Sequence, residues 1–370
     1  MSEHQVYEFV ALDRPLTEKQ MAELRAISTR AKITPSRFWN EYHRGGLAAD
    51  PAQLLLRYFD THLYSANWGS RRLMLRLPRE GLDVKALKAC FPAGGPSTFK
   101  VVRASVVLDF QLGEESYPDE EEASPGSLAA LIPLRTELQR GDLRAAYLAW
   151  LGAVQAGGMS SAAKEPLVPE GLDALSAAQQ ALVGWLRIDE DLLTAAARGV
   201  KTREDDSRAF RAWVRQLAPK EQTRWLLRAV DDPERPLGAE LLRTFRAEHA
   251  PADPQPMRTV RELQTLRDVQ RAARERAEAA RVRAANAVAA RNLQRRLTAL
   301  SRDVDGAWSR LEHRVAASEY DEALRLAEDL RALAARDGEL AGFMARFALL
   351  RGRQSRRRGF FDCWKRQDSV

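Results

Sequence analysis

Cysteine and histidine are both scarce in this chain of 370 residues. The two cysteines, Cys90 and Cys363, lie so far apart in the sequence that they predict neither a disulfide framework nor a zinc knuckle, and they fit a reducing cytoplasm best. The five histidines show no metal-ligand spacing: they are His4, His43, His62, His249 and His313. The sequence therefore predicts no metal site, and it implies no cofactor.

Known signatures of catalysis and of phosphate binding are missing as well. The chain has no Walker motif, no Gly-x-Ser-x-Gly and no Gly-x-Gly-x-x-Gly. The glycines in residues 93–96 precede a predicted strand, so they indicate a turn and not a phosphate-binding loop at a helix start. These absences favour a protein that is not an enzyme, and they single out no catalytic residue. The enzymatic alternative is a site built from dispersed groups, which would contain Tyr42, His43, Asp60 and His62.

Long hydrophobic runs are absent too. No window approaches the ~18 consecutive apolar residues of a membrane-spanning helix. The N-terminus is polar through Gln5, without the basic and apolar regions of a signal peptide. We therefore expect neither export nor membrane insertion, and we expect a cytoplasmic location. The chain is 45% hydrophobic, which is enough for the cores of two or three domains.

Lysine is the rare cation of this chain. Of its 58 positively charged residues, 49 are arginine and nine are lysine. The sequence pI of 9.6 would by itself suggest an acidic partner such as nucleic acid. A GC-rich genome, however, encodes arginine at many neutral surface positions. The clustering of the arginines along the chain therefore carries more weight than their number.

Residues 1–122 combine strand and helix patterns and predict a small α+β domain with three or four strands. The strands are expected at residues 6–12, 37–43, 72–77 and 99–112, the last being one long strand or a hairpin. Thr17 and Gln20 form a capping box for one helix, and Asp50 with Pro51 begins another. We expect the second helix to carry one apolar face made of Leu54, Leu55, Tyr58, Phe59, His62 and Leu63. His62 is then a core residue.

Two segments of this region resemble known sequences. Residues 7–16 (YEFVALDRPL) and 58–78 (YFDTHLYSANWGSRRLMLRLP) are similar to uncharacterised bacterial proteins with no established activity. The resemblance covers mainly the first 80 residues and part of the helical region. It implies no functional residue, cofactor or partner.

The chain after residue 122 is predicted to be helical. Residues 113–126 are rich in acids and proline and predict a linker or an exposed loop. Residues 127–250 predict a helical domain in which the four tryptophans occupy apolar positions, and we expect them in its core: Trp150, Trp185, Trp213 and Trp225. The prolines within residues 251–256 end this domain.

A pattern of helix, turn and helix occurs twice. Residues 134–146 and 311–323 both contain an apolar helix end, a small residue followed by an acid, and the start of a second helix. The pattern is similar to the hairpins of tetratricopeptide-type repeats. Two copies so far apart are no tandem array, so they predict two helical hairpins and not a repeat protein.

Glycine and proline are absent from residues 257–303, and this absence predicts one long helix, followed by the second hairpin up to residue 350. The segment contains twelve arginines and five acids, a surplus of seven that equals the net charge of the whole chain. Its apolar seam is leucine and valine at both ends but alanine in the middle, so it is weaker than a leucine zipper. We expect this coiled-coil-like helix either to pack closely against another helix of the chain or to be partly exposed. The same seam makes this helix a candidate surface for a homo-oligomer.

The arginines of this helix and of a basic aromatic tail, residues 351–370, are the predicted binding groups. The planar guanidinium group suits phosphate. In the tail, arginines lie next to Phe360, Phe361 and Trp364, which suits single-stranded nucleic acid, an anionic membrane surface, or a structural cap on the helices. The candidate polyanion-binding residues are Arg267, Arg271, Arg274, Arg276, Arg281, Arg283, Arg356, Arg357 and Arg358.

These patterns together predict a mainly α protein with a small N-terminal α+β domain. The leading functional hypothesis is a non-enzymatic cytoplasmic scaffold that binds a polyanion, with nucleic acid, either DNA or RNA, as the first candidate. One alternative is an adaptor that binds a partner protein through its helical hairpins. The other is a solvated helix whose arginines serve only solubility.

Overall fold

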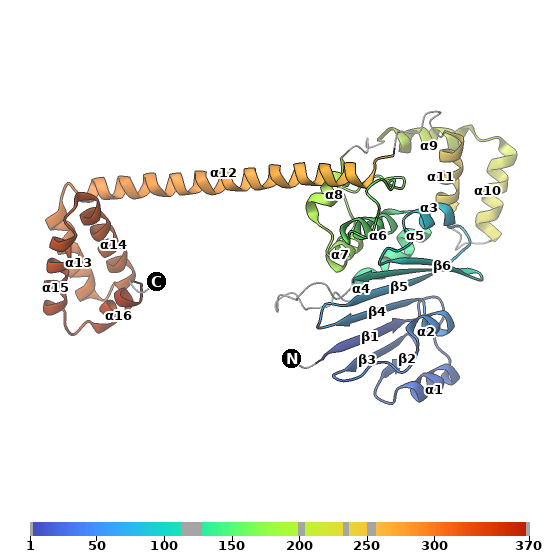
Figure 1. The fold of residues 1–370 in the computed structure, drawn as a ribbon, viewed down its shortest axis with the longest axis horizontal. Coiled ribbons are helices and arrows are strands. Elements are labelled where there is room, and N and C mark those ends of the chain that lie inside the picture. Colours follow the sequence, from blue (N-terminus) through green and yellow to red (C-terminus); the bar gives the residue numbers. More distant parts are fainter. Residues whose placement is uncertain (1–2, 113–127, 199–203, 232–236, 250–256, 368–370) are drawn as a thin grey trace. The chain divides into compact units, whose positions relative to one another are not determined.

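The computed structural model describes residues 3–112, 128–198, 204–231, 237–249 and 257–367 (Figure 1). The chain forms two compact units, Met1–Ala272 and Ala273–Val370, and the division falls inside the long helix α12 (Val260–Leu300). The fold is 59% helical, in agreement with the expected class. The predicted linker at 113–126 and the proline-rich break at 251–256 lie outside the described residues.

The first unit contains an antiparallel sheet of seven strands in the order β2-β3-β1-β4-β5-β7-β6. The sheet is therefore larger than the expected three or four strands. Residues 99–112 form a hairpin, and two further strands had no clear sequence pattern. The strands are β1 (Gln5–Val10), β2 (Lys32–Thr34), β3 (Arg37–Tyr42), β4 (Thr61–Ala66), β5 (Arg71–Pro78), β6 (Thr98–Val102) and β7 (Ser105–Leu112).

Strand β4 replaces part of a predicted helix face. Helix α2 (Pro51–Tyr58) begins as expected, with the Asp50 side chain accepting a hydrogen bond from the Ala52 amide. The chain then becomes extended at Phe59, so the prediction that His62 continues this helix is wrong. The physical reason is non-local: β4 pairs with β1 on one side and β5 on the other, which satisfies its backbone groups along the whole strand.

Helices cover both faces of the sheet. On one face, α1 (Glu18–Ile27) and α2 enclose a core that contains Phe9, Phe38 and Phe59. The capping box of Thr17 and Gln20 at the start of α1 is confirmed. On the other face, strands β4, β5 and β7 share a larger core with the helices that follow in sequence. These are α3 (Val84–Ala89), α4 (Leu128–Leu131), α5 (Pro133–Gln139), α6 (Arg144–Gln155), α7 (Ala177–Trp185) and α8 (Glu190–Ala197).

The larger core links the expected domains 1–122 and 127–250. It contains sheet residues such as Leu75 and helix residues such as Trp150, and it also includes Val260 and Leu263 at the start of α12. Three more helices of this unit are α9 (Glu204–Gln216), α10 (Pro219–Asp231) and α11 (Leu237–Glu248). The four tryptophans expected in the core are all buried.

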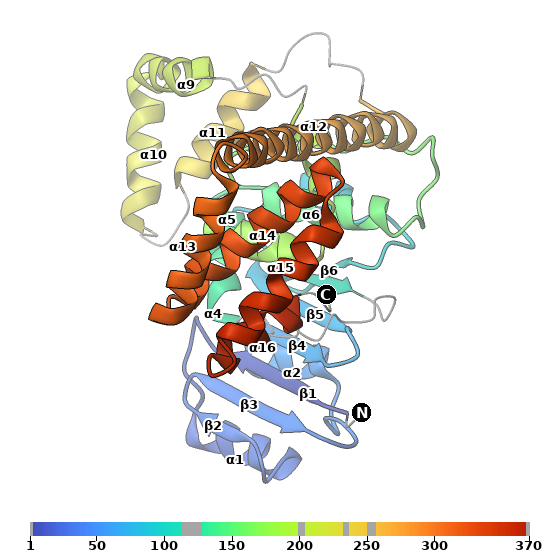
Figure 2. The same cartoon turned by 90° about the vertical axis from the view of Figure 1, so that its left-hand side faces the viewer.

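The second unit consists of α12 from Ala273 onward and of a bundle of shorter helices that follows it (Figure 2). The helices of the bundle are α13 (Val304–Ala317), α14 (Tyr320–Asp337), α15 (Leu340–Arg353) and α16 (Arg358–Gln367). The predicted order of helix, turn and helix is present in both places, as α5 and α6 and as α13 and α14, and the second pair packs together. The turn of the second hairpin places Ser318 at a φ of 66°, in the left-handed region that ends a helix.

Candidate functional site

The start of α12 is held in the first unit by an ion pair whose carboxylate is buried. Both guanidinium nitrogens Nε and Nη2 of Arg258 donate to the carboxylate of Glu165, at 2.6 and 2.9 Å. Glu165 is buried and also accepts a hydrogen bond from the Tyr147 hydroxyl, which helps to raise the pKa of that tyrosine beyond the effect of burial. Arg258 further donates to the carbonyl oxygens of Ala195 and Ala196 at the end of α8. This arginine therefore has a structural role.

The candidate arginines in the first half of α12 up to Arg274 have partners within the chain. Arg271 donates to Asp189, the N-cap residue of α8, and lies 3.6 Å from a carboxylate oxygen of Asp191. Arg267 pairs with the neighbouring Asp268, at 2.7 Å. Arg274 also has an interaction partner. These contacts neutralise part of the charge that the sequence places on α12.

The middle of α12 is different. Every residue from 273 to 292 is exposed, including the alanines and the valines Val282 and Val288. Within the part of the chain that the structure describes, Arg276, Arg281 and Arg283 take part in no ion pair. The sequence allowed the alanine seam either to pack against another helix or to be partly exposed. Over residues 273–292, which we call the exposed segment, the seam is exposed.

The arginines of the exposed segment lie on both sides of its alanine seam. At about 100° per residue, Ala273, Ala277, Ala280 and Ala284 fall within an arc of about 60°. Arg276 and Arg283 follow one edge of this arc, and Arg274 and Arg281 follow the other. The two acids of the segment, Glu275 and Glu278, project from the opposite side of the helix. The result is a narrow strip of small side chains between two rows of cations.

The second half of α12 contains no acid at all. Between Glu278 and Asp303 the sequence has six arginines and no carboxylate. One of them, Arg296, pairs with Asp329 of α14 through two nitrogens, at 3.0 Å each. Arg291 and Arg295 are exposed and, among the described residues, form no ion pair. They were not among the predicted site residues, and they extend the cationic surface along the helix.

The predicted tail is a folded part of the bundle. Phe360 of α16 is fully buried in the core of the second unit, and the Trp364 ring lies 4.9 Å from that of Phe347. Arg357 donates to the Ser318 hydroxyl at 2.9 Å and to the Ala316 carbonyl at 2.6 Å. Of the three predicted arginines of the tail, Arg356 and Arg358 are exposed and have no such contact with the described residues. Burial of Phe360 therefore supports the structural-cap interpretation of the tail.

Two of the four side chains of the enzymatic alternative, His62 and Asp60, have structural partners in the first unit. His62 is buried, with its ring stacked on Phe9 at 4.0 Å and its Nδ1 3.1 Å from the Glu8 carbonyl oxygen. Burial lowers the pKa of His62 to about 3. Asp60 is an acceptor for the amides of Leu12 and Asp13. Burial would raise the pKa of Asp60, but these amides and Arg76 lower it below its usual value. Both side chains therefore have structural roles in the sheet.

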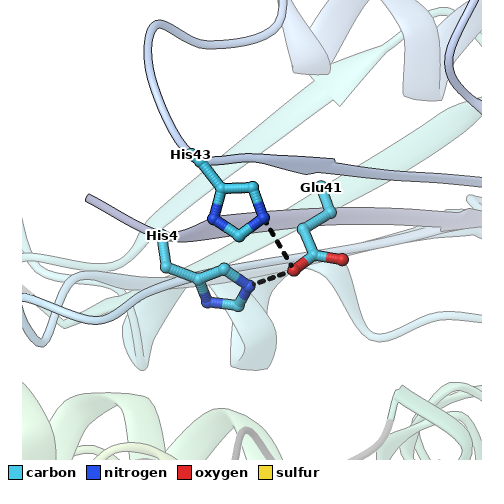
Figure 3. A group of neighbouring side chains, drawn as sticks. All are labelled: His4, Glu41 and His43. Atoms are coloured by element: carbon cyan, nitrogen blue, oxygen red, sulfur yellow. Dashed lines mark hydrogen bonds and ion pairs between the residues drawn. The ribbon is translucent and has the colours of Figure 1, made fainter. Parts of the chain in front are cut away.

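Pairing of strands in the sheet brings His4 and His43, which are 39 positions apart in the sequence, close together. Strands β1 and β3 pair in a register that places Val6 opposite Glu41, and the same register continued by two residues places His4 opposite His43. In Figure 3 both rings face Glu41. The Nε2 atom of His4 lies 2.5 Å from Glu41 Oε1, and that of His43 lies 3.5 Å from the same oxygen. Only the strand register could have revealed this cluster.

The described helices include none whose length and hydropathy would let it cross a bilayer. In comparisons with known proteins, no family model, curated protein or solved structure matches this chain. The similarity of residues 7–16 and 58–78 to uncharacterised bacterial proteins therefore stays a prediction. The functional argument rests on the geometry of α12 and of the sheet.

Proposed function

We propose that this protein is a helical scaffold whose exposed segment, residues 273–292 of α12, binds a polyanion, and that the polyanion is nucleic acid. One observation carries the proposal. Twenty successive residues of a helix are exposed, and they hold five arginines and two acids. Four of these arginines form no ion pair with the residues that the structure describes: Arg276, Arg281, Arg283 and Arg291.

The chemistry of the segment suits a phosphate backbone. Guanidinium groups bind phosphate oxygens through two parallel hydrogen bonds, and they keep their charge at any physiological pH. Alanine between the arginine rows lets the helix backbone approach its ligand closely. Arg291 and Arg295 continue the cationic surface where carboxylates are absent from the sequence. Attraction to phosphate and release of counterions would supply the binding free energy.

Pairing with a second copy through the same strip is disfavoured by charge. In a dimer built on the alanine seam, the rows of Arg276 with Arg283 and of Arg274 with Arg281 would face like charges across the interface. Burial of alanine would offset little of this repulsion, because alanine has fewer carbon groups to bury than leucine. Each buried methylene group contributes about 0.8 kcal/mol of stabilisation. The segment therefore fits an acidic ligand better than itself.

A second candidate function is that of an adaptor for a partner protein. One observation favours it. The apolar side chains of Leu266, Val269 and Val288 are exposed, and their spacing places them on one side of α12. An acidic amphipathic helix could cover this seam and pair with the arginines at its edges. The partner protein would then replace nucleic acid on the same surface.

Fluorescence anisotropy with labelled duplex DNA, single-stranded DNA and RNA tests the first proposal. Titrations between about 50 and 200 mM salt give the slope of log K against log salt, whose magnitude is about 0.9 for each phosphate that the protein neutralises on duplex DNA. We expect the triple variant Arg276→Gln, Arg281→Gln, Arg283→Gln to bind more weakly and to reduce the magnitude of the slope by about two to three.

The matched control is a triple variant in the first unit, Arg14→Gln, Arg30→Gln, Arg44→Gln, which removes the same charge from exposed positions. It should leave the affinity and the slope close to those of the wild type. Equal weakening in both variants, or no binding of any nucleic acid at the lowest salt, would refute the proposal. Pull-down after nuclease treatment identifies the adaptor function, because a protein partner survives the nuclease.

A further inference from the structure

We propose that His4, Glu41 and His43 bind one divalent transition-metal ion of the zinc class, with the fourth position of the ion open to water. The site lies at the end of the sheet where β1 begins and β3 ends. It is independent of α12 and of nucleic-acid binding. The three side chains offer two imidazole nitrogens and one carboxylate oxygen, a donor set that zinc uses in sites with three protein ligands.

The distances between the donor atoms suit such an ion. One nitrogen or oxygen from each of the three residues lies within 4.8 Å of the other two. Zinc bonds of about 2.0 to 2.2 Å in a tetrahedral arrangement place donors about 3.4 Å apart. The distance from His43 Nε2 to Glu41 Oε1, 3.5 Å, already matches this value. The 2.5 Å distance from His4 Nε2 to Glu41 must widen by about 1 Å as the ion replaces the proton between the two groups.

The backbone holds the ligands in place before an ion arrives. Asn67 makes two hydrogen bonds to the backbone of His4. The Asn67 Oδ1 accepts from the His4 backbone amide at 2.9 Å, and the Asn67 backbone amide donates to the His4 carbonyl oxygen at 2.9 Å. Glu41 is inside β3 and in register with β1. Alternation along a strand puts Glu41 and His43 on the same face. Only side-chain rotation remains to be restricted on binding.

The site is open to solvent on one side, which allows an ion to enter. The side chains of His4, Glu41 and His43 are 39%, 34% and 70% exposed. An ion held there would keep a water ligand, since three protein donors leave one tetrahedral position. Two imidazoles favour zinc, cobalt, nickel or copper over magnesium and calcium, which prefer oxygen ligands.

The test uses the full chain, purified without a histidine tag and treated with a chelator. Zinc binding is measured by calorimetry. Cobalt binding is followed by the visible absorption that a tetrahedral site with nitrogen ligands produces. We expect binding of one equivalent of zinc, and we expect His4→Ala and His43→Ala each to weaken it at least tenfold and to abolish the cobalt spectrum. Glu41→Gln keeps the shape of the third ligand and should also weaken binding.

The control variant is His313→Ala, which removes an exposed histidine of the second unit and should change nothing. Circular dichroism of each variant verifies the fold, and the exposed position of His43 makes unfolding of its variant unexpected. Unchanged zinc affinity in both His4→Ala and His43→Ala would overturn the proposal. An equal loss in His313→Ala would overturn it as well, because binding would then be non-specific.

Discussion

Burial decides what a single residue of this protein can do. His62 and His43 are both histidines on neighbouring parts of one sheet, yet the first is enclosed by aromatic rings and the second is mostly solvent-exposed. Enclosure removes water from around His62, so its charged form is disfavoured. Its Nε2 atom has no hydrogen-bond partner within the described chain. His62 therefore stabilises the core only while it is neutral.

The pKa of His62 predicts a specific dependence of stability on pH. The pKa is about 3 in the folded state and 6.5 in the unfolded state. Below pH 6.5 the unfolded chain binds a proton at this residue that the folded chain does not bind. The free energy of unfolding therefore decreases as the pH is lowered from 6.5 to about 3. At pH 5 the loss from this residue is about 2 kcal/mol relative to pH 7.

The variant His62→Phe keeps a ring in the aromatic stack and removes the titration. Urea unfolding at pH 7 and pH 5 should show a smaller difference in stability for this variant than for the wild type, by about 2 kcal/mol. His313→Ala, which removes an exposed histidine, serves as the control and should keep the wild-type difference. If His62→Phe and the wild type lost equal stability between the two pH values, the burial of His62 as a neutral group would be contradicted.

At the scale of elements, α12 obtains its stability from two different sources. Its first turns are held by packing of Val260 and Leu263 and by the ion pair of Arg258 with Glu165. Its last turns bury Leu297 and pair Arg296 with Asp329. Between them, the exposed segment depends on intrinsic helix propensity, which alanine and arginine supply. The abundance of alanine there thus maintains helix where packing is absent.

Glycine substitutions in the exposed segment should therefore loosen it. Each of Ala280→Gly and Ala284→Gly costs about 1 kcal/mol of helix stability, with no packing to compensate. Hydrogen exchange followed by mass spectrometry should show faster exchange of the double variant across residues 273–292, with the cores of both units unchanged. The matched variant Ala280→Gln, Ala284→Gln keeps high helix propensity and should exchange like the wild type. Equal exchange in all three proteins would indicate that some contact stabilises this segment.

At the scale of the whole molecule, each compact unit has its own hydrophobic core. The first unit has two core clusters, one on each face of the sheet, and the second unit has one, which includes Phe343, Phe347 and Phe360. Among the described residues, none of these core clusters contains buried residues of both units. Since cooperative unfolding follows shared cores, the two units are expected to unfold in separate transitions.

Truncation of one core should therefore affect one transition. Phe360→Ala removes a fully buried ring and should destabilise the second unit by about 3 to 5 kcal/mol. Scanning calorimetry of the full chain should show one transition at a lower temperature and the other unchanged. Phe9→Ala, in the first unit, should shift the other transition. A single transition that moves in both variants would show that the two cores unfold together.

The sequence alone determined the features that depend on neighbouring residues. The capping box at Thr17, the start of α2 at Asp50 and the uninterrupted course of α12 all follow from residues within a few positions of one another, where propensity and side-chain capping act. The location of the net charge on α12 was likewise evident without any structure.

Tertiary structure decided what depends on distant residues. The order of the seven strands, the assignment of His62 to a strand, the partners of Arg271 and the meeting of His4 with His43 all require segments that the chain brings together only on folding. The tail shows the same limit: its arginines and aromatics allowed three interpretations in the sequence, and burial of Phe360 supports the structural one. Local patterns fix an element, but strand register and core packing fix which side chains meet, because those are set by pairing free energies over the whole fold.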